Sequence, residues 1–287
     1  MDTGYRLYPG TNDVVFKILF TSNLDYLRSF LSAYLGISES DFGELKVLNP
    51  EIPPAYIKDK FSRLDILAEA AGRKMNVEMQ NISQDYYDSR SLYYWAKMFV
   101  DSLKSGEEYD EAPVCITLGI LNFIMFKEEE AGFHSRFRIF EENRKTLLTD
   151  KLDMHFVELP KVRKLIGEET DMQKQWAELL LAETKEELSM IEQNTNSSVI
   201  KNAAGTIRDI SADERNKALL WAREKSIRDE AAALHHAEKK FRAEGRKEGR
   251  AEGRAEGRAE ERKKLIAKFR AAGVSEEMIE AALNMND

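Results

Sequence analysis

The chain has 287 residues, 43% of them hydrophobic and 33% charged, which allows one sizeable buried core and an appended segment. A formal net charge of -8 argues against a general polyanion binder, so nucleic acid would have to bind at a local patch. The single cysteine excludes an internal disulfide, and no stretch reaches the roughly 18 apolar residues of a membrane span. Since the N-terminal segment lacks the pattern of a secretory signal, we expect a cytoplasmic protein without membrane contact.

The first 160 residues predict a mixture of helices and strands. Thr11-Asn12-Asp13 can cap a helix from Val14, and a second helix is expected over Leu24–Leu35, ended by Gly36. Short apolar or alternating runs predict six strands, at Leu45–Leu48, Phe61–Ala70, Met75–Gln80, Val114–Ile120, Phe133–Phe140 and His155–Leu159. A further helix is expected over Gln84–Lys104. The order αβββαβ predicts an α/β or α+β fold around a mixed sheet.

After about Lys161 the strand signal disappears and the composition favours helix. Residues 168–193 and 211–240 are rich in Ala, Leu, Glu, Lys and Gln. In the tract AEGRKEGRAEGRAEGRAEER that follows, like charges recur at i,i+4, which is unfavourable on a helix. Its four glycines each cost about 1 kcal/mol relative to Ala in a helix interior. We therefore expect a marginal helix or a linker, unless a partner orders it, and then a short helical hairpin divided by Gly273.

These changes in composition predict four parts. They are an α/β domain at 1–165, a helical region at 166–240, a low-complexity linker or marginal helix at 241–262, and a helical hairpin at 263–287. We expect the helical tail to mediate homo-oligomerisation. Residues 238–270 hold 13 Lys or Arg against 7 Glu and are the candidate basic patch.

The segment FSRLDILAEAAGRKMNVEMQ predicts a β-hairpin with one polar face. A two-residue turn at Gly72-Arg73 would pair Ala71 with Lys74 and set Asp65 opposite Gln80. Because side chains alternate along a strand, one face would carry Arg63, Asp65, Leu67, Glu69, Asn76, Glu78 and Gln80. The other face would carry Ile66, Ala68, Ala70, Met75, Val77 and Met79. Two carboxylates and an amide would then converge on the polar face.

Such a cluster suits a hard divalent cation, because Mg²⁺ and Mn²⁺ prefer oxygen ligands, as does Ca²⁺. Asp65 and Glu78 would be ligands, and the backbone carbonyl of Met79 could be a third. Gln80 could orient an attacking water. Asp13 is a further candidate ligand, the other interpretation being an acid that caps a helix or lies in its first turn.

The helix expected at 84–104 carries two stripes of side chains. The first should pack on the sheet and consists of Leu92, Ala96, Phe99, Val100 and Leu103. The second could grip phosphates or stack on bases, or be an ordinary amphipathic surface, and consists of Tyr86, Arg90, Tyr94 and Lys97. Lys17 could also contact phosphate, or be a solvated surface lysine.

The pattern Asp65-x12-Glu78-x-Gln80, on two adjacent strands followed by a helix, resembles the PD-(D/E)xK nuclease fold. More narrowly, NDVVFKILF at 12–20, RLDILAEA at 63–70, NVEMQ at 76–80 and YYDSRSLYYWAKMF at 86–99 resemble the Rpn group of recombination-promoting nucleases, also labelled putative transposases. The resemblance covers about residues 8–160 and implies a restriction-endonuclease-like fold that cleaves DNA with a divalent metal. On that basis Asp65 and Glu78 match the metal ligands, and Gln80 stands at the position of the motif lysine.

Three functions fit these patterns. The first is a DNA endonuclease that acts in recombination or on mobile DNA. The second is a decayed nuclease that binds DNA without cutting it, against which the intact set of Asp65, Glu78 and Gln80 argues. The third is an assembly module formed by the helices of 168–287, which is compatible with the first because two protomers can cut two strands.

Overall fold

The computed structural model describes residues 5–49, 66–103, 106, 108–127, 132–162, 171–275 and 277–278. The chain divides into two compact units, Met1–Arg228 and Asp229–Asp287. Helix α8 (Glu214–Ala271) contributes residues to both. In the described part of the chain, no helix combines the length and the apolar character needed to cross a membrane.

A six-stranded mixed sheet lies at the centre of the first unit, in the order β1-β2-β3-β4-β6-β5. Its strands are β1 (Lys46–Val47), β2 (Ile66–Ala70), β3 (Arg73–Gln80), β4 (Val114–Leu121), β5 (His134–Phe137) and β6 (Leu152–Glu158). The neighbours β3, β4 and β6 run parallel, and the other pairs are antiparallel. The predicted mixed sheet is confirmed, although the strand expected at 61–70 begins outside the described residues.

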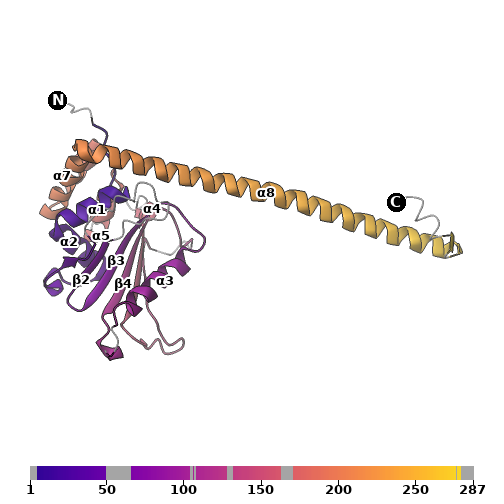
Figure 1. Cartoon of the computed structure of the whole chain (residues 1–287), viewed down its shortest axis with the longest axis horizontal. Helices are drawn as coiled ribbons and strands as arrows, with labels where there is room; N and C mark the ends of the chain where they lie inside the picture. The colour runs from indigo at the N-terminus through magenta and orange to yellow at the C-terminus, as the bar shows by residue number, and fades with distance from the viewer. Residues whose placement is uncertain are drawn as a thin grey trace. The chain divides into compact units, whose positions relative to one another are not determined.

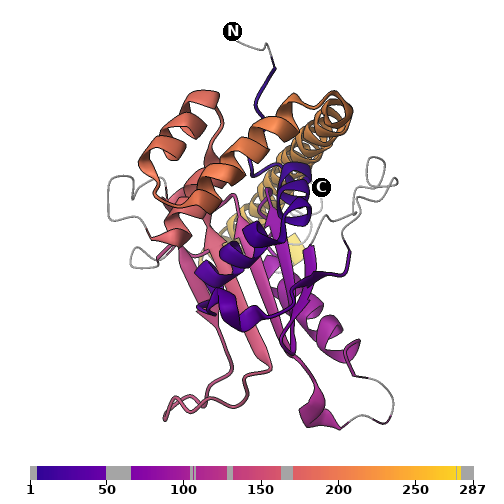
Figure 2. The ribbon, with the colours of Figure 1, turned by 90° about the vertical axis from the view of Figure 1, so that its left-hand side faces the viewer.

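Helices cover both faces of the sheet (Figures 1 and 2). On one face lie α1 (Asp13–Ser22) and α2 (Leu24–Leu35), against which α5 (Met172–Leu181) and α7 (Ser198–Ala212) pack. Helix α6 (Lys185–Asn194) packs on α5 and α7. The opposite face carries α3 (Tyr87–Val100). Short helical turns complete the unit at Glu39–Phe42, Tyr109–Glu111 and Leu159–Val162 (α4).

The first helix begins where the sequence predicts, within one residue, and the second begins and ends where the sequence predicts. The side chain of Asn12 accepts hydrogen bonds from the backbone N–H groups of Val14 and Val15, which caps α1. Gly36 ends α2 with φ of 66°, in the left-handed conformation that glycine adopts without strain.

The main core lies between the apolar face of the sheet and the helical layer. Phe20 and Phe30 of the first two helices pack on Trp176 of α5, with ring centroids 5.4 and 5.6 Å apart. Ile200 and Ile207 of α7 are also fully buried in this core. Helices α5 and α7 therefore share the core of the α/β elements before them, and the division into four parts stays a prediction.

The packing face of α3 differs from the predicted stripe. Leu92 and Val100 are 50% and 66% exposed, whereas Tyr87 and Ser91 are buried. The indole N–H of Trp95 donates to the backbone carbonyl of Cys115, 3.0 Å away. The prediction was wrong because it followed apolar character alone, while polar atoms on this face of the sheet accept hydrogen bonds from the helix.

The glycine-containing tract AEGRKEGRAEGRAEGRAEER is helical, as in the first of the two predicted alternatives, a marginal helix or a linker. It lies inside α8, between segments rich in strong helix formers. Because nucleation is the costly step of helix formation, flanking helix can extend through a tract that would be marginal alone. The helix ends at Ala271, and Gly273 follows with φ of 76°, as expected for a helix stop.

Candidate active site

The hairpin of β2 and β3 turns at Ala71-Gly72, with φ of 48° and 70°. Two residues with positive φ are typical of the type I′ turn, whose twist matches that of the paired strands. Ala70 pairs with Arg73 and Ile66 with Val77. The predicted turn at Gly72-Arg73, and with it the register that set Asp65 opposite Gln80, was wrong.

The error in register leaves the predicted faces unchanged. Each residue of β2 pairs two positions earlier on β3 than expected, and a shift of two returns a side chain to the same face. Ile66, Ala68 and Val77 are buried in the main core, as predicted for the apolar face. Glu78 lies on the opposite face of β3, under α3, and is only 6% exposed.

Arg90 of α3 joins the two motif residues of β3. Its Nη2 donates to Glu78 Oε1 and to Gln80 Oε1, each at 2.9 Å. Its Nη1 donates to Gln84 Oε1, and its guanidinium lies 4.7 Å from the centre of the Tyr87 ring. The Glu78 and Arg90 side chains are 8% and 12% exposed, so this is a largely buried ion pair.

The amide of Gln80 is held in one orientation. Its Nε2 donates to the carbonyl oxygen of Ile82 at 2.8 Å, and its Oε1 accepts from Arg90. Since an amide has distinct donor and acceptor ends, these two bonds fix which end faces Arg90.

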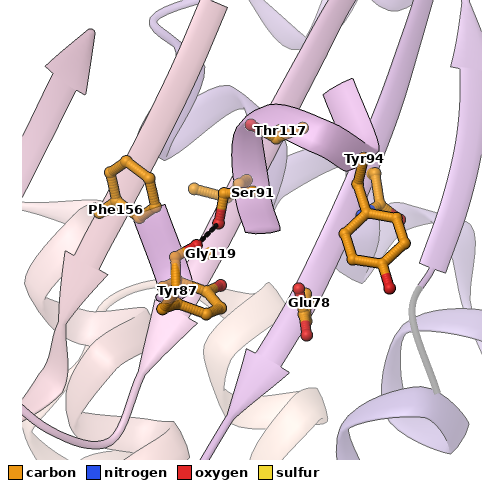
Figure 3. Close-up of a pocket in the computed structure, with 9 residues that line it drawn as sticks. Glu78, Tyr87, Ser91, Tyr94, Thr117, Gly119 and Phe156 are labelled. Atoms are coloured by element: carbon orange, nitrogen blue, oxygen red, sulfur yellow. Dashed lines mark hydrogen bonds between the residues drawn. The ribbon is translucent and has the colours of Figure 1, made fainter. Parts of the chain in front are cut away.

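A small cavity adjoins Glu78 between α3 and the sheet (Figure 3). Its volume of about 10 Å³ is close to what one water molecule requires. Thr117 of β4 lines it, and the buried Oγ1 of this residue has no hydrogen-bond partner in the described structure. The other lining residues are Asn76, Tyr87, Ser91, Tyr94, Leu118, Gly119 and Phe156. The cavity therefore offers a site about the size of one water molecule beside the Glu78 carboxylate.

The lack of a side chain at Gly119 lets Tyr87 approach the sheet closely. A Cβ at this position would lie 2.7 Å from the Tyr87 hydroxyl and 3.3 Å from Cδ1 of Phe156. Figure 3 shows Tyr87 and Phe156 on either side of this strand position. Gly119 thus sets the distance between α3 and the sheet at the candidate site.

Two of the predicted site residues have structural partners. Asp13 lies in the first turn of α1, and its Oδ2 accepts from Nε of Arg223 at 2.6 Å. Lys17 is 1% exposed, and its Nζ donates to the backbone carbonyl of Asn49. The interpretation of Lys17 as a solvated surface lysine was wrong, and burial also removes it from direct contact with DNA in this conformation.

The predicted stripe on α3 separates into different environments. Arg90 turns inward to Glu78, whereas Lys97 is exposed and pairs with Asp101 at 3.2 Å. Tyr94 is half-buried and lines the cavity beside Glu78. Sequence reasoning grouped Arg90 with these residues by spacing and missed its contact with the motif. The sequence signal that could have indicated this contact is a single acid in the strand at 73–80 followed by a single arginine in the next helix.

Asp65 lies outside the described residues, as do Arg63 and Leu64. Within the described part of the chain, the fold therefore brings together Glu78, Gln80 and Arg90, with Met79 between the first two in β3. The roles predicted for Asp65, and for Met79 through its backbone carbonyl, stay predictions.

A mixed sheet flanked by helices, with an acid-x-Gln pair on a central strand, defines an α/β protein with a PD-(D/E)xK-like fold. The chain belongs to the family described as PD-(D/E)XK nuclease family transposase, whose model matches residues 10–237. The resemblance to the Rpn group is confirmed at this level, and the match extends through α5–α7 into α8. Searches of curated proteins and of solved structures found no significant match.

Proposed function

We propose that this protein is a Mg²⁺-dependent DNA endonuclease that hydrolyses phosphodiester bonds in recombination or on mobile DNA. The main support is the position of Glu78 and Gln80, which the resemblance in sequence assigns to the motif and which lie together under α3 on the polar face of the sheet. A buried carboxylate beside a small cavity is a candidate for function, although its pairing with Arg90 would also stabilise it in the fold.

The donors near Glu78 fit a hard cation if Asp65 completes the set. The described residues contain no group of three or more His, Cys, Asp or Glu that could hold a metal. Asp65 directly precedes Ile66, and the strand partner of Ile66 is Val77, which directly precedes Glu78. We therefore propose Asp65 and Glu78 as the carboxylate ligands and the backbone carbonyl of Met79 as a third oxygen, the donor type that Mg²⁺ and Mn²⁺ prefer.

A bound metal would polarise the phosphodiester and lower the pKa of the attacking water. Gln80 would hold this water with its amide, whose orientation Arg90 and the Ile82 carbonyl fix. Tyr94 and the exposed Lys97 would contact the DNA beside the site. Asp13 stays a candidate additional ligand.

A plasmid nicking assay with Mg²⁺, Mn²⁺, Ca²⁺ or EDTA tests the proposal. We expect metal-dependent cleavage by the wild type and a loss of at least about 100-fold in Asp65→Ala and Glu78→Ala. Glu69→Ala is the matched control, because Glu69 is an exposed acid on the same hairpin. Folded wild type that cuts neither plasmid nor single-stranded DNA would contradict the enzyme, and a gel shift would then test the DNA-binding alternative.

We also infer that the tail forms a homo-oligomer through α8. Phe241 and Leu265 are 71% and 44% exposed on a helix whose glycine-rich tract has low intrinsic stability. Light scattering should give a mass above 33.0 kDa for the full chain, and Phe241→Ser with Leu265→Ser should lower it. A monomeric wild type would contradict this inference without affecting the nuclease proposal.

A further inference from the structure

The motif position that carries lysine in many nucleases is occupied here by a neutral amide. Gln80 can accept and donate hydrogen bonds but supplies no positive charge. Two carboxylates neutralise one Mg²⁺, so the negative charge that develops on a phosphodiester during hydrolysis would lack a compensating cation. Electrostatic stabilisation of developing charge is commonly the largest contribution to catalysis.

Arg90 of α3 places a positive charge beside Glu78 and Gln80. One nitrogen, Nη2, donates to both Glu78 and Gln80 at 2.9 Å. None of the described residues that line the adjoining cavity is a lysine, arginine or histidine. The charge of Arg90 therefore lies within hydrogen-bond distance of the residue that stands at the lysine position of the motif.

The guanidinium is also fixed in place. Gln84 accepts from Nη1, and the ring of Tyr87 lies beneath the guanidinium plane at 4.7 Å. The planar group of arginine suits such a stacked and hydrogen-bonded position, because all its donors have set directions. A cation held this way needs little reorganisation during a reaction, unlike one on a mobile surface side chain.

We propose that Arg90 is a positioning residue of the nuclease site, which supplies the positive charge absent at position 80 and aligns the Glu78 carboxylate with the Gln80 amide. This inference rests on the proposed nuclease function. It predicts that the charge, rather than the arginine itself, is required, so that a lysine placed at position 80 should compensate for its loss.

The test compares wild type, Arg90→Ala, Arg90→Lys and the double variant Arg90→Ala/Gln80→Lys. We expect kcat to fall at least about 100-fold in Arg90→Ala with KM for DNA within about threefold, and to recover at least about tenfold in the double variant. Arg90→Lys should retain intermediate activity, since it keeps the charge but loses the fork of donors. Arg144→Ala, which removes an exposed arginine from a loop, should cleave as the wild type does.

Calorimetric titration with Mn²⁺ provides a second readout that is independent of cleavage. The affinity of Arg90→Ala for Mn²⁺ should stay within about threefold of wild type. Loss of a nearby positive charge raises this affinity, whereas loss of the alignment of Glu78 lowers it.

Cleavage by Arg90→Ala at the wild-type rate would overturn this inference alone. A double variant that does not recover would also overturn it, with loss of Mn²⁺ binding showing a structural role for Arg90 and intact Mn²⁺ binding showing that charge alone does not explain its effect. A folded wild type without cleavage would overturn the nuclease proposal itself and this inference with it.

Discussion

Nε2 of His134 lies 2.9 Å from Nδ1 of His155, and the two rings stack with centroids 5.2 Å apart. A hydrogen bond between two imidazole nitrogens requires that one of them accepts, so it cannot form when both rings are fully protonated. His155 Nε2 lies 3.1 Å from Asp153 Oδ1 on the other side of the pair. Arg136 binds the same carboxylate through two nitrogens.

This arrangement predicts that stability decreases in weak acid. Burial, and then the charge of His155, lower the pKa of His134 to about 4, below its ordinary value of 6.5. Between these two pH values, His134 binds a proton in the unfolded chain but not in the folded chain. The free energy of unfolding is therefore highest above pH 6.5 and decreases as the pH falls toward 4. His134→Gln, which stays neutral, should flatten this dependence by on the order of 1–2 kcal/mol after discounting for partial exposure. Urea unfolding at pH 7 and pH 4.5 measures it, and an equal pH dependence in wild type and variant would contradict it.

Gly119→Ala should separate α3 from the sheet. The new Cβ would meet the Tyr87 hydroxyl at 2.7 Å, closer than real contacts allow, and would press on Phe156. Overpacking of this kind costs about 1–3 kcal/mol, which urea unfolding can measure. Gly132→Ala is the control, since a Cβ there meets nothing within 4 Å. If both variants unfold at the same urea concentration, the close approach at Gly119 does not limit the packing of α3.

The pair of Asp13 and Arg223 should stabilise the contact between α1 and α8 in the first unit. Both side chains are largely buried, at 7% and 16% exposure. Asp13→Asn should lower the free energy of unfolding by about 1–3 kcal/mol, since it removes the charge that Arg223 binds. Asp25→Asn, an exposed first-turn acid of α2, should change it by less than about 0.5 kcal/mol. A clear fall in Mn²⁺ affinity for Asp13→Asn would instead support the metal-ligand interpretation.

The glycines of α8 should limit its helical stability. Gly245, Gly249, Gly253 and Gly257 have open space where a Cβ would lie. Replacing all four with Ala should raise helix stability by about 1 kcal/mol per site, visible as a higher thermal midpoint in far-UV circular dichroism. If the glycines instead allow close contact with a second copy, light scattering will show a lower mass for the variant.

The hairpin of β2 and β3 shows which structural features can be predicted from local sequence and which cannot. Alternation along 66–70 and 75–80 assigned Glu78 and Gln80 to one face and Val77 to the other, because successive strand side chains always point in opposite directions. The exact turn was decided by backbone twist, which favours two residues of positive φ at Ala71-Gly72. The local pattern therefore determined the face of the sheet on which each side chain lies, and the pairing of the strands determined which residue lies opposite it.

By itself, the sequence determined the start of α1 and the end of α2, because a cap depends on residues close together in the chain. It also predicted the mixed sheet, from the order of the helices and strands. Only the tertiary structure decided that Lys17 is buried and that Asp13 pairs with Arg223, more than 200 residues away. It also decided that Arg90 turns inward to the motif, since the side of α3 that faces the sheet depends on the polar groups beneath it. Such contacts arise from packing between distant segments, which helical or strand periodicity does not encode.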